Sequence, residues 1–131
     1  MDLTRLFSIE GKTAVVTGGS RGIGEMIAAG FLANGARVYI TSRKADVCDA
    51  TAKRLADEYG GECVSLPADL SKLEGIDDFA ARLRERESAV HVLVNNAGVS
   101  WGAPLDEFPE VGWDKVMDTN VKGVFFLTQR L

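Results

Sequence analysis

A glycine-rich segment near the start of the chain has the residue types needed to bind phosphate groups. Gly18, Gly22 and Gly24 follow an apolar run with the spacing G-x-x-x-G-x-G. In such a turn the first glycine permits a tight exit from a strand, the second leaves room for a pyrophosphate, and the third lets the helix pack closely. The helix N-terminus then offers unpaired N–H groups and a partial positive charge to an anion. We therefore predict a dinucleotide-binding turn formed by Gly18, Ser20, Arg21, Gly22, Ile23 and Gly24.

The type of dinucleotide is indicated by the residues that follow the next apolar run. Units that bind NAD usually place an acid about 20 residues past the last glycine, where it holds the ribose 2′-OH. Here Ser42 stands 18 residues after Gly24, and Arg43 and Lys44 follow it. No carboxylate would repel a 2′-phosphate, and Arg21, Arg43 and Lys44 would attract one. These charges alone are also compatible with a solvated loop, but together with the missing acid they favour NADP(H) over NAD(H).

Two alternative nucleotide-binding classes fit the sequence less well. The glycine turn lacks the Gly-Lys-Ser/Thr ending of a nucleoside-triphosphate P-loop. The absence of an acid after the second apolar run also weighs against an S-adenosylmethionine methyltransferase, which needs a partner for its ribose hydroxyls. A plain connecting turn with no ligand is the remaining alternative, but the strand before it and the helix after it favour nucleotide binding.

The elements that must position these residues alternate along the chain. Short segments rich in β-branched residues predict strands at 13–17, 36–41, 62–66 and 90–95. Apolar residues at helical spacing predict a first helix through Ile23, Ile27 and Phe31, which ends at the C-cap pair Asn34-Gly35. The same spacing predicts a second helix through Val47, Thr51, Leu55 and Tyr59, which ends at Gly60-Gly61. A third helix is predicted from a capping box, Ser71 with Glu74, through Ile76, Phe79 and Leu83, and a fourth over about 112–131.

This alternation predicts one α/β domain over residues 1–131. We expect a Rossmann-type doubly wound parallel sheet with strand order 3-2-1-4, truncated before a fifth strand, and with helices on both faces. Ligands of such sheets bind beyond the carboxyl ends of the strands, which is where the glycine turn and Ser42 fall.

Composition and charge exclude several other classes. The 131 residues are 46% apolar and 26% charged, which is typical of a globular domain. A net charge of −4 argues against non-specific nucleic-acid binding, and no apolar run is long enough to cross a membrane. The N-terminal segment carries Asp2 and Glu10 and does not read as a signal peptide. Cys48 and Cys63 lack disulfide-framework or metal-ligand spacing, so we expect reduced thiols, no metal and a cytoplasmic location.

Three motifs in order resemble the short-chain dehydrogenase/reductases, and among them the NADPH-dependent 3-oxoacyl-carrier-protein reductases. They are the glycine turn, Asp69 after the third strand, and Asn95-Asn96-Ala97-Gly98 after the fourth. The resemblance implies that Asp69 meets the adenine amino group with Leu70 alongside. It further implies that Asn95 to Gly98, with Asn96, Ala97 and Gly98 as cofactor contacts, form a floor beneath the adenosine. The alternatives for these residues are a helix cap at Asp69 and a simple turn after the fourth strand.

One polar residue interrupts the apolar stripe of the last predicted helix. Asn120 lies among Trp113, Val116, Met117, Val124, Leu127 and Leu131. By itself a buried amide there favours a structural contact. The resemblance instead implies that Asn120 is the family's catalytic asparagine, which holds a water in a proton relay to a lysine.

Part of the family's chemistry has no counterpart in these residues. The family uses Ser and Tyr-x-x-x-Lys, but the only tyrosines, Tyr39 and Tyr59, are followed four residues later by Arg43 and Cys63. We therefore expect the cofactor-binding half of an NADP(H)-dependent oxidoreductase that acts on a small carbonyl or alcohol, and that forms a homodimer or homotetramer through the last helix. A non-catalytic nucleotide-binding module and a fragment engineered for folding studies are the alternatives. Of these residues, only 99–105 are candidates to line the substrate pocket.

Overall fold

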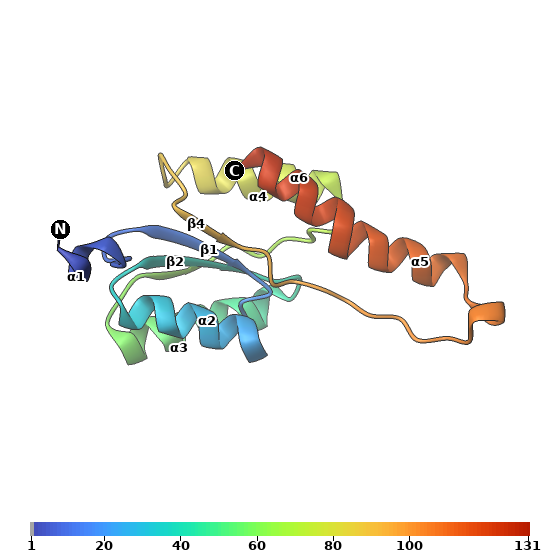
Figure 1. The fold of residues 1–131 in the computed structure, drawn as a ribbon, viewed down its shortest axis with the longest axis horizontal. Coiled ribbons are helices and arrows are strands. Elements are labelled where there is room, and N and C mark those ends of the chain that lie inside the picture. Colours follow the sequence, from blue (N-terminus) through green and yellow to red (C-terminus); the bar gives the residue numbers. More distant parts are fainter. Residues whose placement is uncertain (1) are drawn as a thin grey trace.

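The computed structural model describes residues 2–131, which form a four-stranded parallel sheet in the order β3-β2-β1-β4 (Figure 1). The strands are β1 (Thr13–Thr17), β2 (Arg37–Thr41), β3 (Cys63–Ser65) and β4 (Val92–Val94). The predicted fold class and strand order are therefore confirmed. The second, third and fourth strands are shorter than predicted, because the residues at their ends lie beyond the paired register of their neighbours.

Helices cover both faces of the sheet. In Figure 1, α2 (Gly22–Ala33) and α3 (Ala45–Tyr59) form one layer, and α4 (Leu73–Arg84) and α6 (Val124–Arg130) form the other. The predicted C-caps of the first two helices are confirmed, since Gly35 and Gly60 have φ of 79° and 68°. A short helix, α1 (Leu3–Leu6), precedes β1 and was not predicted, because its single turn gives no apolar periodicity.

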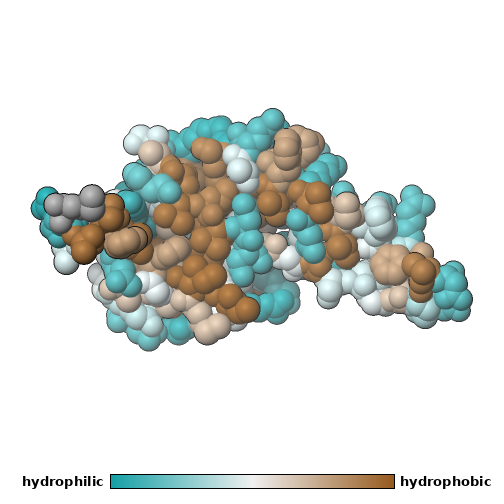
Figure 2. All heavy atoms as spheres, viewed as in Figure 1, coloured by the Kyte–Doolittle hydropathy of each residue, from teal (hydrophilic) through white to brown (hydrophobic). Residues whose placement is uncertain are grey.

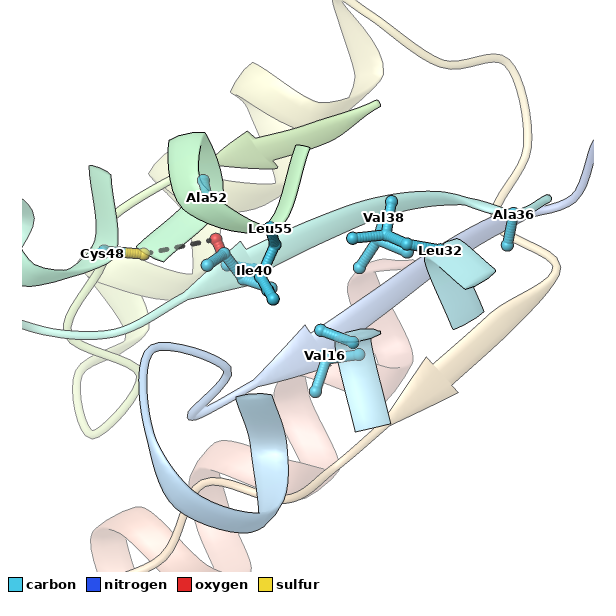
Figure 3. Close-up of a cluster of buried hydrophobic side chains, with 9 residues drawn as sticks. Val16, Leu32, Ala36, Val38, Ile40, Cys48, Ala52 and Leu55 are labelled. Carbon is cyan, nitrogen blue, oxygen red and sulfur yellow. Dashed lines mark hydrogen bonds between the residues drawn. The ribbon is translucent and has the colours of Figure 1, made fainter. Parts of the chain in front are cut away.

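Two apolar cores lie on opposite faces of the sheet. Figure 3 shows the core beneath α2 and α3, where side chains such as Val16, Ile40 and Leu55 come from strands and helices together. Cys48 lies in this core and its Sγ is 3.6 Å from the Ile40 carbonyl oxygen. Burial, and secondarily the neighbouring Cys48, raises the pKa of the Cys63 thiol to about 12, which is unfavourable for thiolate chemistry.

The buried faces of α2 and α3 differ from the predicted stripes. On α2 the fully buried residues are Gly24, Ala28 and Leu32, whereas Ile23 is 66% exposed. On α3 the buried residues are Cys48, Thr51, Ala52 and Leu55, and the predicted Val47 and Tyr59 lie at the surface. For α2 the buried face is shifted by one residue from the prediction, because the small residues Gly24 and Ala28 allow the helix to approach the sheet closely. The predicted Ile27 and Phe31 still pack against this core but are only partly buried.

The last helical region begins at Glu110, two residues before the predicted start, and it is not a single regular α-helix. It consists of α5 (Glu110–Met117), a π-helical turn (Asp118–Gly123) and α6, following a long loop that contains a 3-10 turn (Leu105–Glu107). Gly123 closes the π-helical turn where an added Cβ would overlap the Leu70 carbonyl oxygen. The helix therefore comes directly against the segment after β3, while α5 extends beyond the sheet (Figure 1).

One edge of the sheet remains apolar and partly exposed. β4 pairs only with β1 in the described part of the chain, and its three residues are half-buried. Figure 2 shows apolar residues gathered over the region that β4 occupies in Figure 1. Among residues 2–131, no helix combines the length and apolarity that would let it cross a membrane.

Candidate nucleotide-binding site

A cleft of about 500 Å³ opens at the carboxyl ends of the strands. Its lining comes from the turn after β1, the end of β2, the segment after β3 and the segment after β4. All fourteen residues predicted to contact the cofactor line this cleft: Gly18, Ser20, Arg21, Gly22, Ile23, Gly24, Ser42, Arg43, Lys44, Asp69, Leu70, Asn96, Ala97 and Gly98. They lie together because the carboxyl ends of parallel strands are on the same side of the sheet. Asn120 does not line the cleft.

The glycine turn has the geometry for which glycine is required. Gly18 and Gly22 have φ of 64° and 58°, in the left-handed region that other residues avoid. A Cβ at Gly24 would overlap the Gly18 carbonyl oxygen and lie 2.6 Å from Asn96 Nδ2. At Gly22 a Cβ would meet nothing within 4 Å, so the space above this position is open to a ligand.

Asn96 holds the first part of the turn against the end of β4. Its Nδ2 donates to the carbonyl oxygens of Thr17, at 3.0 Å, and Gly18, at 3.3 Å. The Thr17 hydroxyl in return accepts from the N–H groups of Asn96 and Ala97. This reciprocal bonding fixes the two segments together, and it explains why an amide side chain occurs here.

The end of β2 presents positive charge to the cleft. Arg43 and Lys44 are exposed, as is Arg21 across the cleft. None of these three side chains has an ion-pair partner among the residues that the structure describes. Ser42 stands half-buried beside them and introduces no negative charge. The arrangement offers unpaired cations to an anionic ligand.

Asp69 is arranged differently from the prediction. α4 begins at Leu73 with Lys72 as its N-cap, and no side chain caps it, so the predicted capping box of Ser71 and Glu74 is wrong. The Ser71 hydroxyl instead donates to Asp69 Oδ1 at 2.6 Å, and the Ser71 N–H donates to the same oxygen at 3.1 Å. Burial raises the pKa of Asp69, but these hydrogen bonds, together with the positive charges of Lys72 and Arg43, outweigh burial and leave that pKa below its ordinary value. Asp69 therefore faces the cleft as a carboxylate.

The segment after β4 divides between the cleft and the helix layer. Ala97 and Gly98 line the cleft, but the predicted contribution of Asn95 to the floor is not seen. Asn95 Nδ2 lies 3.3 Å from Thr128 Oγ1 of α6 and so contacts the helix layer instead. The two asparagines thus hold neighbouring elements on different sides of the sheet.

Asn120 is exposed rather than buried, which corrects the prediction of a buried amide. It lies in the π-helical turn, and its Oδ1 accepts from the Val99 N–H at 2.9 Å while its Nδ2 donates to the Val99 carbonyl at 2.8 Å. Both side-chain groups are therefore engaged with one backbone residue. This contact fixes the loop after Gly98, and the water-holding role stays a prediction.

Trp101, one of the residues 99–105 that were candidates to line a substrate pocket, packs against α5. A Cβ at Gly112 would lie 2.7 Å from the Trp101 ring, and Lys115 Nζ is 5.5 Å from the ring centroid. Trp101 also lines a second cavity of about 360 Å³, which shares Val99 with the main cleft. The loop after β4 therefore borders both hollows.

Further cleft residues were missed by the sequence analysis. They are Thr41, Val47, Ala68, Ser71, Val99 and Thr119. The first five lie within three residues of a predicted contact, so the segment was found but not its full extent. Thr119 comes from the π-helical turn beside the predicted Asn120, and its approach to the cleft was not predicted because it depends on how that helix packs.

Comparison with known proteins agrees with this geometry. A 3-oxoacyl-[acyl-carrier-protein] reductase of rhamnolipid biosynthesis from Pseudomonas aeruginosa is 52% identical over 125 residues, covering 95% of this chain and 48% of the relative. The chain thus spans about half the length of the curated relatives it matches.

Solved structures match equally well. A Pseudomonas aeruginosa RhlG/NADP active-site complex superposes with a TM-score of 0.90 at 52% identity, covering 95% of this chain and 48% of that one. L-sorbose reductase from Gluconobacter frateurii, complexed with NADPH and L-sorbose, gives 0.91 at 31% identity, with 95% and 47% covered. The family described as short chain dehydrogenase matches residues 12–131. With its parallel sheet, its glycine turn and this match over most of its length, the chain belongs to the short-chain dehydrogenase/reductase family.

Proposed function

We propose that this chain binds NADP(H) and forms the cofactor half of an oxidoreductase that transfers hydride between the nicotinamide and a carbonyl or alcohol substrate. The observation that carries the proposal is the cleft itself, because every predicted cofactor contact lines it. The cofactor supplies the hydride chemistry when bound, and the protein binds and orients it. The solved relatives that contain NADP and NADPH support the choice of cofactor.

Each wall of the cleft has a proposed part in binding. The turn from Gly18 to Gly24 takes the pyrophosphate at the N-terminus of α2. Arg43, with Arg21 and Lys44, takes the 2′-phosphate, since guanidinium groups match phosphate oxygens. Asp69 has its Oδ1 occupied by Ser71, and its Oδ2, 4.0 Å from Lys72 Nζ, is the oxygen that would accept from the adenine amino group.

The remaining walls have parts in holding the adenosine and in positioning the reaction. Leu70 flanks the adenine, and Asn96, Ala97 and Gly98 lie beneath the adenosine, where small residues allow a close approach. We assign Asn120 to the catalytic side because it fixes Val99, which borders both the main cleft and the second cavity. The whole protein's substrate would enter from that side as a small carbonyl or alcohol compound.

The last helical region has the surface expected of a contact between subunits. Trp113, Val121 and Phe125 are 60%, 53% and 63% exposed. Large apolar side chains exposed along one helical region, here α5, the π-helical turn and α6, are more typical of interfaces than of free surface. They support the proposal of a homodimer or homotetramer through this helix.

The cofactor proposal is tested by titrating NADPH and NADH into the wild type and an Arg43→Asp variant. Loss of a charge-assisted hydrogen bond is worth roughly 1.5–3 kcal/mol, so NADPH affinity should fall by roughly ten- to a hundredfold. NADH affinity should change little, because NADH has no 2′-phosphate. Lys12→Asp is the matched control because it makes the same charge change at a distant position. Lys12 is exposed and lies at the amino end of β1, whereas the cleft lies at the carboxyl ends of the strands. It should leave both affinities unaltered.

Two different failures are separable in this experiment. A wild type that binds neither nucleotide would refute the nucleotide-binding function. Unchanged NADPH binding by Arg43→Asp would refute only the assignment of the 2′-phosphate site.

A further inference from the structure

A buried threonine of α3 contacts the glycine turn directly. Thr51 is 6% exposed, and its hydroxyl donates to the Ser20 carbonyl oxygen at 2.8 Å. A threonine inside a helix usually bonds to a carbonyl of its own preceding turn. Here the hydroxyl leaves its helix and joins a residue 31 positions earlier in the chain. The hydrogen bond therefore links α3 to the turn after β1.

The contact completes a set that fixes the turn residue by residue. Asn96 holds the carbonyl groups of Thr17 and Gly18, and the Gly19 N–H donates to the Thr41 carbonyl at 3.3 Å. These contacts come from the ends of neighbouring strands. Ser20 is the next residue of the turn, and its carbonyl accepts from Thr51 of α3.

Fixing the Ser20 carbonyl also fixes a donor of the turn. Ser20 is 7% exposed, so its carbonyl cannot rely on water and needs a protein partner. The carbonyl of Ser20 and the N–H of Arg21 belong to one planar peptide group, so they cannot rotate independently. A hydrogen bond that orients the carbonyl therefore sets the direction of the Arg21 N–H, in the turn that lines the cleft.

A second contact, one turn further along α3, joins α3 to the first turn of α2. Arg54 Nη2 lies 2.5 Å from Glu25 Oε1, and Glu25 is in the first turn of α2. The Arg54 side chain is about half exposed, so this ion pair contributes less than a buried one would. α3 begins directly after Lys44, so one helix connects the cations at the end of β2 with the turn after β1.

We propose that Thr51 is a positioning residue for the pyrophosphate of the bound nucleotide, which it serves by fixing the peptide between Ser20 and Arg21. The inference rests on the proposed NADP(H) binding and adds a residue outside the cleft lining to it. Thr51 touches no ligand, and its effect passes through the turn. Of the three cations proposed for the 2′-phosphate, Arg43 and Lys44 follow β2 and bind it without Thr51, and only Arg21 adjoins the peptide that Thr51 fixes.

The test measures the affinity of three nucleotides for the wild type and Thr51→Val, which has nearly the same shape but no hydroxyl. NADPH and ADP contain a pyrophosphate, and 2′-AMP does not. We expect Thr51→Val to weaken NADPH and ADP by about tenfold, as for a lost hydrogen bond that strands a buried carbonyl. Binding of 2′-AMP should change less than twofold. Thr51→Ser, which keeps the hydroxyl, should restore affinity, and Thr51→Ala serves if the valine variant does not fold.

A control separates positioning from general loosening of α3. Ala52→Gly weakens the same helix at the neighbouring buried position, where Ala52 belongs to the apolar core, by at least about 1 kcal/mol. It should lower stability yet leave all three affinities within twofold.

Three results would overturn the inference. They are unchanged ADP affinity in Thr51→Val, an equal loss for 2′-AMP, or a loss in Ala52→Gly that matches the loss in Thr51→Val. Failure of the wild type to bind NADPH is a separate outcome, because it refutes the proposed function and the inference together.

Discussion

Two glycines of α2 should respond in opposite directions to the same substitution. Gly24 and Gly30 lie six residues apart on this helix, and alanine favours a helix by about 1 kcal/mol over glycine. At Gly30 an added Cβ meets nothing within 4 Å. At Gly24 it overlaps the Gly18 carbonyl oxygen and comes within 2.6 Å of Asn96 Nδ2. The surroundings of each added Cβ, and not helix propensity, should therefore decide whether the substitution raises or lowers the free energy of unfolding.

The magnitudes follow from these contacts. Gly30→Ala should raise the free energy of unfolding by about 0.5–1 kcal/mol, since it gains propensity without strain. Gly24→Ala places its Cβ about 1 Å short of ordinary van der Waals contact, and both groups it meets are held by hydrogen bonds. Overpacking of this kind costs roughly 1–3 kcal/mol, so we expect a net loss of about 2 kcal/mol. The two variants should thus differ by roughly 3 kcal/mol.

Urea denaturation followed by circular dichroism measures the stability of each variant, and an NADPH titration measures the site. Gly24→Ala should also bind NADPH at least about tenfold more weakly, because relieving the overlap displaces the Gly18 carbonyl from Asn96. Gly30→Ala should bind as the wild type does. If Gly24→Ala proves as stable as Gly30→Ala and binds NADPH normally, close packing is not the reason for a glycine at this position.

Two further predictions concern groups outside the turn. Burial raises the pKa of Glu87, but hydrogen bonds from Arg37, Tyr39 and Thr13, together with the positive charge of Arg37, outweigh burial and leave that pKa below its ordinary value of 4.5. The carboxylate therefore stabilises the fold above about pH 4.5, and this stability is lost as pH falls through the lowered pKa. Glu87→Gln should flatten the acid limb of a stability–pH curve, and an unchanged limb would contradict the assignment. Asn120→Ala should leave the N–H and carbonyl of Val99 without their partner. The kcat of the full enzyme should then fall by at least about tenfold while NADPH affinity changes little. Equal losses in kcat and in affinity would instead indicate a general collapse of the loop.

Much of the site could be predicted because it follows from topology. Alternating strands and helices predict a parallel sheet, and a parallel sheet brings the residues after each strand to one edge. Gly18, Ser42, Asp69 and Ala97 are far apart in sequence, yet all line one cleft. No detailed packing was needed to predict this meeting.

Local spacing was a poorer guide to side-chain contacts. The Ser71 spacing indicated a cap for α4, but the helix starts at Leu73 with Lys72 at the N-cap position, and the Ser71 hydroxyl donates to Asp69. Asn120 was placed in an apolar stripe, but the π-helical turn rotates it toward Val99. In both cases two local arrangements compete within a few residues, and periodicity does not distinguish them.

The sequence by itself determined the order of the elements, the glycine turn and the charge at the end of β2, because these depend on residue type and on neighbours along the chain. Only the tertiary structure decided which face of α2 packs on the sheet, where Gly24 and Ala28 replace the predicted Ile23. It also decided that the Thr51 hydroxyl reaches Ser20. Such contacts depend on how closely two packed elements approach each other, and that distance results from all the side chains between them.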